Sequence, residues 1–137
     1  QLHGCNYYRY KLMSTLKVNT IQNTSGGSSS TPEQIEQGRA KSWINFDGTG
    51  TVSIRDSFNV SSLVDDSTGN YQINFSNNFS NANYSITVGG SRDIPESSRC
   101  HFPNIDGMTT SKFEIHLHND GSTSVDWELV QCACFGD

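Results

Sequence analysis

Regular alternation of apolar and polar residues is the feature that most constrains the fold of this chain. Residues 71–75 have the sequence Tyr-Gln-Ile-Asn-Phe, and the same period of two recurs at 84–88 and 113–117. Successive side chains of a β-strand point to opposite faces, so this period predicts strands with one buried and one exposed face. Further strands are expected at 43–46, 52–58, 60–64 and 125–135.

Turn-forming residues separate these segments at nearly regular intervals. Clusters rich in Asp, Gly and Asn occur at 47–50, 65–70 and 119–121, and a longer connection is expected over 91–111. Asn119-Asp120-Gly121 is typical of a hairpin. Six or seven short strands joined in this way predict an all-β domain over residues 41–137, either a small antiparallel β-sandwich or a jelly-roll-like fold.

Residues 1–40 differ in character and are predicted to be an extended N-terminal segment used for attachment and oligomerisation. The run from Ser25 to Thr31 is expected to be a flexible linker or an unpacked stalk segment. A short helix is expected at 32–40, with Thr31 as the N-cap, Pro32 in the first position and Gly38 at its end.

Composition excludes several partners. The net charge is −5 at pH 7 and only 17% of residues are charged, so no basic surface for nucleic acid is expected. No apolar run approaches the roughly 20 residues of a membrane-spanning helix, and no membrane insertion is expected. The four cysteines lack metal-site spacing and are expected to be free, mostly buried thiols: Cys5, Cys100, Cys132 and Cys134.

No catalytic motif is complete, so we expect a non-enzymatic protein without a cofactor. Asp65 and Asp66 are adjacent, which points them to opposite faces of a strand, and a solvated turn is the simpler reading. Asp47-Gly48-Thr49-Gly50 is similar to the active-site triplet of aspartic proteases, which need two such loops. His116 and His118 share one face of a strand. They are either exposed polar residues or, around a three-fold axis, six imidazoles able to bind a metal.

Residues 40–90 carry a pattern that resembles a segment near the C-termini of bacteriophage tail-fibre proteins. The matching residues are Trp43, Phe46, Gly48, Thr49 and Gly50; Asn59 to Ser62; Gly69, Tyr71 and Phe75; and Asn81 to Tyr84. The ending Val130 to Gly136 is similar to the terminal strand of that family, and Met13 to Ile21 resembles the openings of small cyanophage structural proteins.

This resemblance implies a virion structural protein on the tail or capsid surface, assembled in the cytoplasm of a bacterial host. The expected function is recognition of a host receptor during adsorption, with a surface glycan as a possible ligand. Two alternatives remain open: a capsid or tail decoration protein that binds other virion proteins, and a polysaccharide depolymerase. The missing fibre shaft favours decoration, and the lack of an acid pair argues against the depolymerase.

Long polar loops on a β scaffold are the expected receptor-binding elements. They supply the candidate residues Arg92, Asp93, Arg99, Asn104 and Asp106.

The resemblance also implies a homotrimer, and the N-terminal segment supports it on physical grounds. Three apolar residues in 14–31 cannot offset the backbone entropy of ordering that stretch, roughly 1–2 kcal/mol per residue. The expected trimer contacts are Leu16, Val18, Ile21 and Ile35. The same segment is expected to contact other virion proteins.

Overall fold

The computed structural model describes residues 15–91, 103–119 and 122–136. The chain divides into two compact units, an N-terminal unit of residues 1–35 and a sandwich domain of residues 36–137. Each unit is described by itself. No helix in the described residues is long and apolar enough to cross a membrane.

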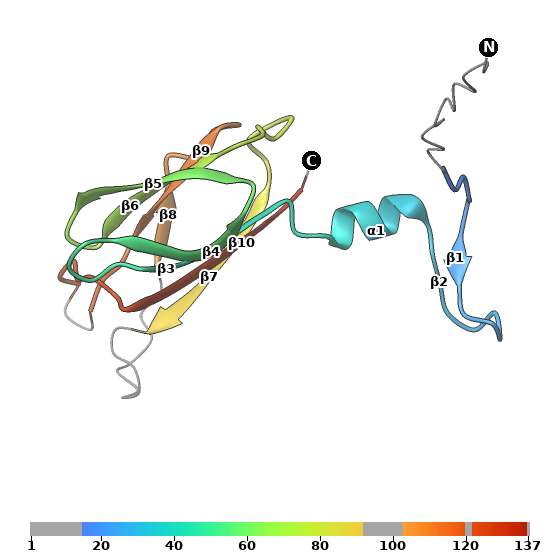
Figure 1. Cartoon of the computed structure of the whole chain (residues 1–137), viewed down its shortest axis with the longest axis horizontal. Coiled ribbons are helices and arrows are strands. Elements are labelled where there is room, and N and C mark those ends of the chain that lie inside the picture. The colour runs from blue at the N-terminus through green and yellow to red at the C-terminus, as the bar shows by residue number, and fades with distance from the viewer. Residues whose placement is uncertain (1–14, 92–102, 120–121, 137) are drawn as a thin grey trace, which may run out of the picture. The chain divides into compact units, whose positions relative to one another are not determined.

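The sandwich domain consists of two four-stranded antiparallel sheets (Figure 1). The first sheet has the order β4-β3-β10-β7, comprising Ser53–Phe58, Ser42–Asp47, Leu129–Phe135 and Ser85–Ser91. The second has the order β5-β6-β9-β8, comprising Val60–Ser67, Asn70–Phe75, Lys112–His116 and Asn104–Asp106. The predicted antiparallel β-sandwich is therefore confirmed.

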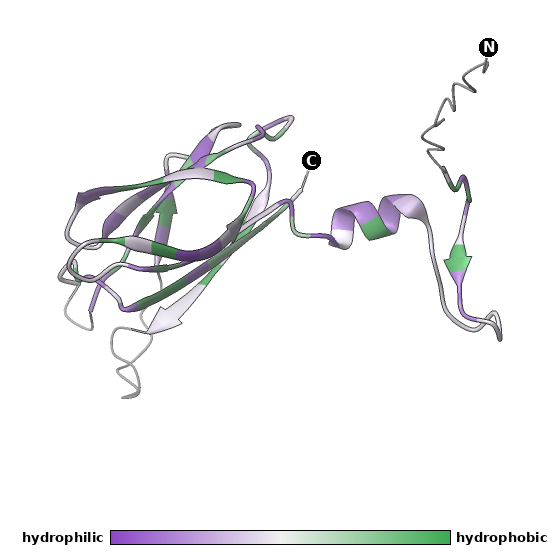
Figure 2. Ribbon diagram, viewed as in Figure 1, coloured by the Kyte–Doolittle hydropathy of each residue, from purple (hydrophilic) through white to green (hydrophobic). Residues whose placement is uncertain are grey.

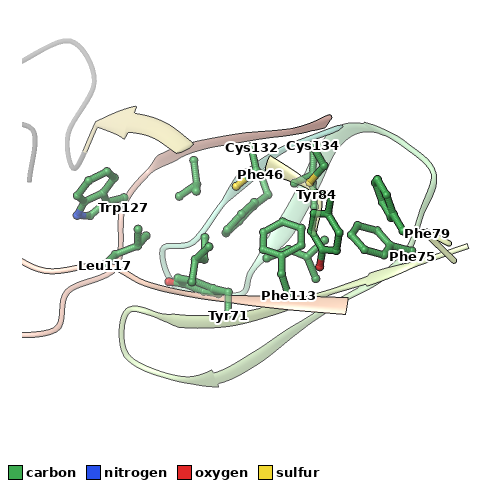
Figure 3. Packing of buried hydrophobic residues seen from close by; sticks show 14 residues of the cluster. Phe46, Tyr71, Phe75, Phe79, Tyr84, Phe113, Leu117, Trp127, Cys132 and Cys134 are labelled. Carbon is green, nitrogen blue, oxygen red and sulfur yellow. The ribbon is translucent and has the colours of Figure 1, made fainter. Parts of the chain in front are cut away.

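The core lies between the two sheets and is rich in aromatic rings (Figure 3). The ring of Phe75 contacts three other aromatic rings of the core. Its centroid lies 4.7 Å from that of Phe79, 5.6 Å from that of Tyr84 and 5.8 Å from that of Phe113. Aromatic pairs at these separations add to the stabilisation from burial. The core residues come from segments that are far apart in the sequence. The two sheets therefore pack together as one domain.

The alternation of apolar and polar residues in the sequence matches the alternation of buried and half-buried residues along the strands. In β6 and β9 every second residue is buried, and the residues between them are half-buried on the outer face. β3 and β10 show the same pattern, and Figure 2 shows apolar and polar residues interleaved along these strands. By contrast, β4 and β5 are edge strands made almost entirely of exposed residues.

The hairpin predicted at 119–121 is only partly right. The Asn119 amide donates to Thr123 O (2.9 Å) and His118 forms an isolated bridge with Ser124, so the chain does turn there. The flanking strands β9 and β10, however, belong to different sheets. The prediction that the last strand begins at Val125 is also wrong: β10 begins at Leu129, and Trp127 is buried in the connection that crosses between sheets.

Two further predictions need correction. The connection predicted over 91–111 contains a strand, β8, which pairs with β9. The turn predicted at Asp65 and Asp66 is wrong, because both residues lie exposed within β5, beside a register shift between Asp65 and Ser67. The reversal itself comes after Ser67, the last residue of β5, and Gly69 there has a positive φ of 72°.

The chain enters and leaves the sandwich at the same end. β3 begins at Ser42 opposite Cys134 near the end of β10, and the Lys41 amide donates to Cys134 O (2.8 Å). At the opposite end β7 finishes at Ser91 and β10 starts at Leu129. We call this opposite end the far end.

The N-terminal unit contains a small ribbon. β1 (Ile21–Gln22) pairs with β2 (Ser29–Ser30), so two residues of the Ser25–Thr31 run lie in a strand, and the exposed residues before them form the turn. The turn between them is held by Asn23 Oδ1, which accepts from the amide of Gly27 (2.9 Å).

The short helix α1 (Pro32–Gly38) begins and ends close to the positions predicted, and Gly38 is its last residue. Thr31 is its N-cap: Thr31 Oγ1 accepts from the Gln34 amide (3.2 Å), and Gln34 Oε1 accepts from the Thr31 amide (2.9 Å). This reciprocal pair satisfies two amides that the first helical turn leaves unbonded.

Candidate functional site

The outer face of the second sheet carries a set of polar side chains, which we call the polar ladder; on β5 the exposed Val64, which is paired with Gln72, interrupts it. These residues occupy the outward positions of β5, β6, β9 and β8 in register: Ser62, Asn70, Gln72, Asn74, Asn104, Asp106, Lys112, Glu114 and His116. Amide, carboxylate, ammonium and imidazole groups thus lie on one face, away from the core.

Hydrogen bonds across strands hold the middle of the polar ladder in place. Lys112 Nζ donates to Gln72 Oε1 (2.5 Å) and to Glu114 Oε1 (2.6 Å). Gln72 Nε2 donates to Asn74 Oδ1 (3.0 Å), and Asn74 Nδ2 donates to Ser62 Oγ (3.0 Å). Each amide and carboxylate still has donor or acceptor capacity beyond these bonds, so the face is both ordered and able to bind.

His116 extends the polar ladder toward the far end. Asn70 Nδ2 donates to Ser67 Oγ (2.8 Å), which leaves Asn70 Oδ1 as the acceptor for His116 Nδ1 at 2.6 Å. In the neutral ring the proton is then on Nδ1, and Nε2 is an acceptor.

The two histidines flank the buried Leu117, but only His116 lies in β9, and His118 forms an isolated bridge with Ser124 beyond the end of that strand. His118 Nδ1 is buried without a hydrogen-bond partner in the structure. Within the described ranges, no three His, Cys, Asp or Glu side chains are close enough to hold a metal ion. A metal site shared around a three-fold axis stays a prediction.

The structure places two of the five receptor-binding candidates within the polar ladder. Asn104 is paired with His116 and Asp106 with Glu114, both as exposed residues of β8. They were predicted to lie in a loop, which is wrong, but their position extends the polar face to the edge of the sheet. Arg92, Asp93 and Arg99 lie outside the described residues.

The turn after β8 fits closely around Glu114. Gly107 has φ 56°, and a Cβ atom there would lie 2.7 Å from Cδ of Glu114. The Gly107 amide donates to Asp106 Oδ1 (2.7 Å). The positive φ favours glycine at this position, and a side chain there would displace the flexible end of Glu114.

Behind the polar ladder, Asp126 links the two sheets through a buried phenol. Asp126 Oδ1 accepts from Tyr71 Oη (2.6 Å) and from the Gly69 amide (2.7 Å). Tyr71 Oη also lies 2.9 Å from Gly48 O, and a Cβ on Gly48 would lie 2.5 Å from Oη. Burial, and then the contact with Asp126, raises the pKa of Tyr71. Sequence analysis missed Asp126, because no local pattern distinguishes it.

Asn59, part of the tail-fibre-like pattern, has a structural role. It joins the edge strands β4 and β5 with φ 57°, a value that Asn tolerates better than most residues. Its Nδ2 donates to Lys41 O (3.1 Å) and to Asn77 O (3.0 Å), while Oδ1 accepts from the Asn77 amide (2.7 Å). This side chain ties together three segments at the end where the chain enters.

The carboxylates considered for catalysis have other surroundings. Asp47 accepts from the side chain and amide of Thr49, and Arg55 Nη2 lies 2.9 Å from Asp47 Oδ2. The hydrogen bonds from Thr49, and then the charge of Arg55, lower the pKa of Asp47. Asp65 and Asp66 are exposed on an edge strand. Asp47 is therefore ionised and held in a hairpin turn.

The thiols of β10 belong to the core. Cys132 and Cys134 are free and buried, on the same face of the strand, as the sequence predicted (Figure 3). Burial raises the pKa of both thiols, that of Cys134 to about 12, so both are protonated and unreactive at neutral pH. Cys5 and Cys100 lie outside the described residues.

The four residues predicted as trimer contacts gather in the N-terminal unit. They line one hollow of about 580 Å³, together with Lys17, Asn19, Pro32 and Glu33: Leu16, Val18, Ile21 and Ile35. The structure brings these four residues together; whether they form a trimer contact stays a prediction.

Comparisons with family models, curated proteins and solved structures gave no match to this chain.

Proposed function

We propose that this chain is a virion structural protein, a tail-fibre-like module of a bacteriophage that recognises a host receptor during adsorption. The tail-fibre-like pattern at 40–90 supports the class of protein. The observation that carries the binding function is the polar ladder, a preorganised polar face on a rigid β scaffold. The proposed location is the virion, on the tail or capsid surface, after assembly in the host cytoplasm.

A surface glycan is the receptor chemistry that fits this face. The polar ladder presents neutral amides together with one ammonium and two carboxylates, Lys112, Glu114 and Asp106. Sugar hydroxyls both donate and accept hydrogen bonds, as these amides do. A phosphate-rich ligand would instead need a basic surface. Because the side chains are held by one another, little conformational entropy is lost when a ligand binds.

A glycan array probed with the purified full-length chain tests this proposal. Gln72→Ala and Asn104→Ala are expected to reduce binding of the recognised glycan at least roughly tenfold, since each removes ligand contacts worth about 1.4 kcal/mol or more. Gln131→Ala is the matched control, because this exposed residue of β10 belongs to the other sheet. Absence of glycan binding, or equal loss in the control, would contradict the proposal.

Two companion measurements separate the alternatives. Immunogold electron microscopy of virions is expected to label the tail; labelling spread over the capsid would indicate a decoration protein. Incubation with the bound polysaccharide is expected to leave it intact, since we propose no enzymatic activity. Release of shorter saccharides, abolished by Asp47→Asn, would identify a depolymerase instead.

A further inference from the structure

The dipeptide Asp-Gly occurs twice in the described part of the sandwich domain, each time with the Asp as the last residue of a strand. Asp47-Gly48 follows β3 and Asp106-Gly107 ends β8. The backbone nitrogen that follows an aspartate can attack the side-chain carboxyl and close a five-membered succinimide ring. Glycine favours this reaction, because it has no Cβ atom to hinder the nitrogen and its backbone moves freely. The two sites share this chemistry, so their surroundings decide which of them reacts.

The reacting groups of Asp106-Gly107 are already in contact. The Gly107 amide donates to Asp106 Oδ1 (2.7 Å). Because Oδ1 is bonded to Cγ, the nitrogen lies beside the carbon that it would attack, and such contact accelerates an intramolecular step. All three residues of β8 are exposed, and β8 is at the edge of its sheet. Water therefore reaches this site, and the backbone there can open locally.

The same groups are held apart at Asp47-Gly48. The Gly48 amide donates to Trp127 O (2.9 Å), and Gly48 is buried. The Asp47 carboxylate is turned toward Thr49 and Arg55. The hydrogen bonds from Thr49, and then the charge of Arg55, lower the pKa of Asp47. An ionised carboxylate has no hydroxyl group to leave as water, so this side chain is a poor target for attack.

We propose that Asp106 of the folded chain isomerises spontaneously to isoaspartate through a succinimide formed with Gly107, whereas Asp47 is protected. The Gly107 nitrogen bonds to Cγ of Asp106, the bond from Cγ to its hydroxyl breaks, and the hydroxyl leaves with the amide proton as water. Water then adds to the backbone carbonyl carbon of Asp106, and the bond from that carbon to nitrogen breaks. The chain now continues through Cγ, its mass is unchanged, and water is the only other reactant.

The modification acts on the edge of the polar ladder. It lengthens the main chain by one carbon between β8 and the following turn, and the former backbone carbonyl becomes the free carboxylate. Asp106 is paired with Glu114, and the turn at Gly107 packs against the Glu114 carboxylate. Isomerisation therefore moves the carboxylate of residue 106 out of register with Glu114. The reaction itself does not depend on the receptor-binding function.

Peptide mapping of the full-length chain after prolonged incubation at physiological temperature tests this proposal. The two sites fall on separate tryptic peptides, residues 42–55 and 100–112. Electron-based fragmentation of each peptide distinguishes isoaspartate from aspartate. Isoaspartate is expected to form at Asp106 at least roughly tenfold faster than at Asp47, which corresponds to about 1.4 kcal/mol in activation free energy. Equal rates at the two sites, or no isoaspartate at Asp106, would overturn the proposal.

The same chain incubated in urea is the control for the role of the fold. Unfolding removes the contacts of Gly48 with Trp127 and of Asp47 with Arg55, so both sites are expected to react at similar rates. A preference for Asp106 that persists unchanged in urea would mean that local sequence causes it, which also overturns the proposal. Gly107→Ala in the folded chain is expected to slow the reaction at Asp106 at least roughly tenfold, since a Cβ atom hinders the nitrogen.

Discussion

Phe46 in the sandwich domain is 0% exposed, whereas Leu16 in the N-terminal unit is 81% exposed. The two regions thus use apolar residues in opposite ways. Strands in the sandwich domain alternate, so one face of each sheet is covered by the other sheet. The N-terminal unit has apolar side chains but no second layer to cover them. The difference shows that apolar side chains are covered within the chain in the sandwich domain and left exposed in the N-terminal unit.

The largest expected effect comes from removing a buried ring. Phe46→Ala should lower the free energy of unfolding by about 3–5 kcal/mol, through lost burial and the cavity left behind. Leu16→Ala should change the free energy of unfolding of the sandwich domain by no more than about 0.5 kcal/mol, since it removes an exposed side chain. Urea denaturation followed by tryptophan fluorescence measures both. Similar losses in the two variants would contradict the comparison.

A pair of glycines sharpens the comparison, because both have φ 72° and differ in surroundings. A Cβ at Gly69 would lie 2.6 Å from Leu117 O, whereas a Cβ at Gly26 would have no neighbouring heavy atom within 4 Å. Gly69→Ala should therefore cost more than the roughly 1–3 kcal/mol of backbone strain alone. Gly26→Ala should leave the sandwich domain's thermal midpoint unchanged. If Gly69→Ala were tolerated equally well, the close packing of this turn would be disproved.

Loss of the buried phenol should have a smaller effect. Tyr71→Phe keeps the ring but removes the donor to Asp126, leaving a partly buried carboxylate with one bond fewer, at a cost of about 1–3 kcal/mol. The change in the midpoint of chemical denaturation at pH 7 checks this. No change would mean that water replaces the phenol without loss.

Alkaline pH should weaken the sandwich domain gradually. Burial raises the pKa of Tyr84 and of Cys134 to about 12, above ordinary values of 10.0 and 9.0. The folded state therefore retains protons that the unfolded chain releases, so the stabilisation is complete below about pH 9 and is lost as pH rises toward 12. Denaturation midpoints between pH 8 and 11 should fall, and Tyr84→Phe should make the fall shallower. A midpoint that rises with pH would refute this assignment.

Strands with strict alternation were the most clearly predicted, whereas β8, which lacks it, was missed. Residues 71–75 and 113–117 gave clear signals because one face of each packs on the core. β8 is a short exposed strand with a single apolar residue, Ile105, so it shows no alternation of apolar and polar residues. The pairing of β9 and β10 was misjudged because the sequence Asn119-Asp120-Gly121 indicates only a local reversal of the chain, whereas sheet membership depends on contacts across the whole domain.

The candidate site was predictable only in fragments. Asn104 and Asp106 were chosen for their polar surroundings, and their pairing with β9 depends on a strand that the sequence did not reveal. The outward residues Gln72 and Glu114 followed from the alternation, but their alignment requires the register of β6 against β9. That register is set by core packing between distant segments.

The position of the chain's entry has a mechanical consequence. A load applied at the far end, toward which the polar ladder extends through His116, would pull β3 along its own axis against an anchor before Ser42. Hydrogen bonds of an antiparallel pair run perpendicular to the strands, so such a load shears all the bonds of β3 to β10 and β4 together. Peeling, in which bonds rupture one after another, would require pulling across the sheet. The same fold would thus hold firmly against tension from the anchor while yielding more readily to sideways force.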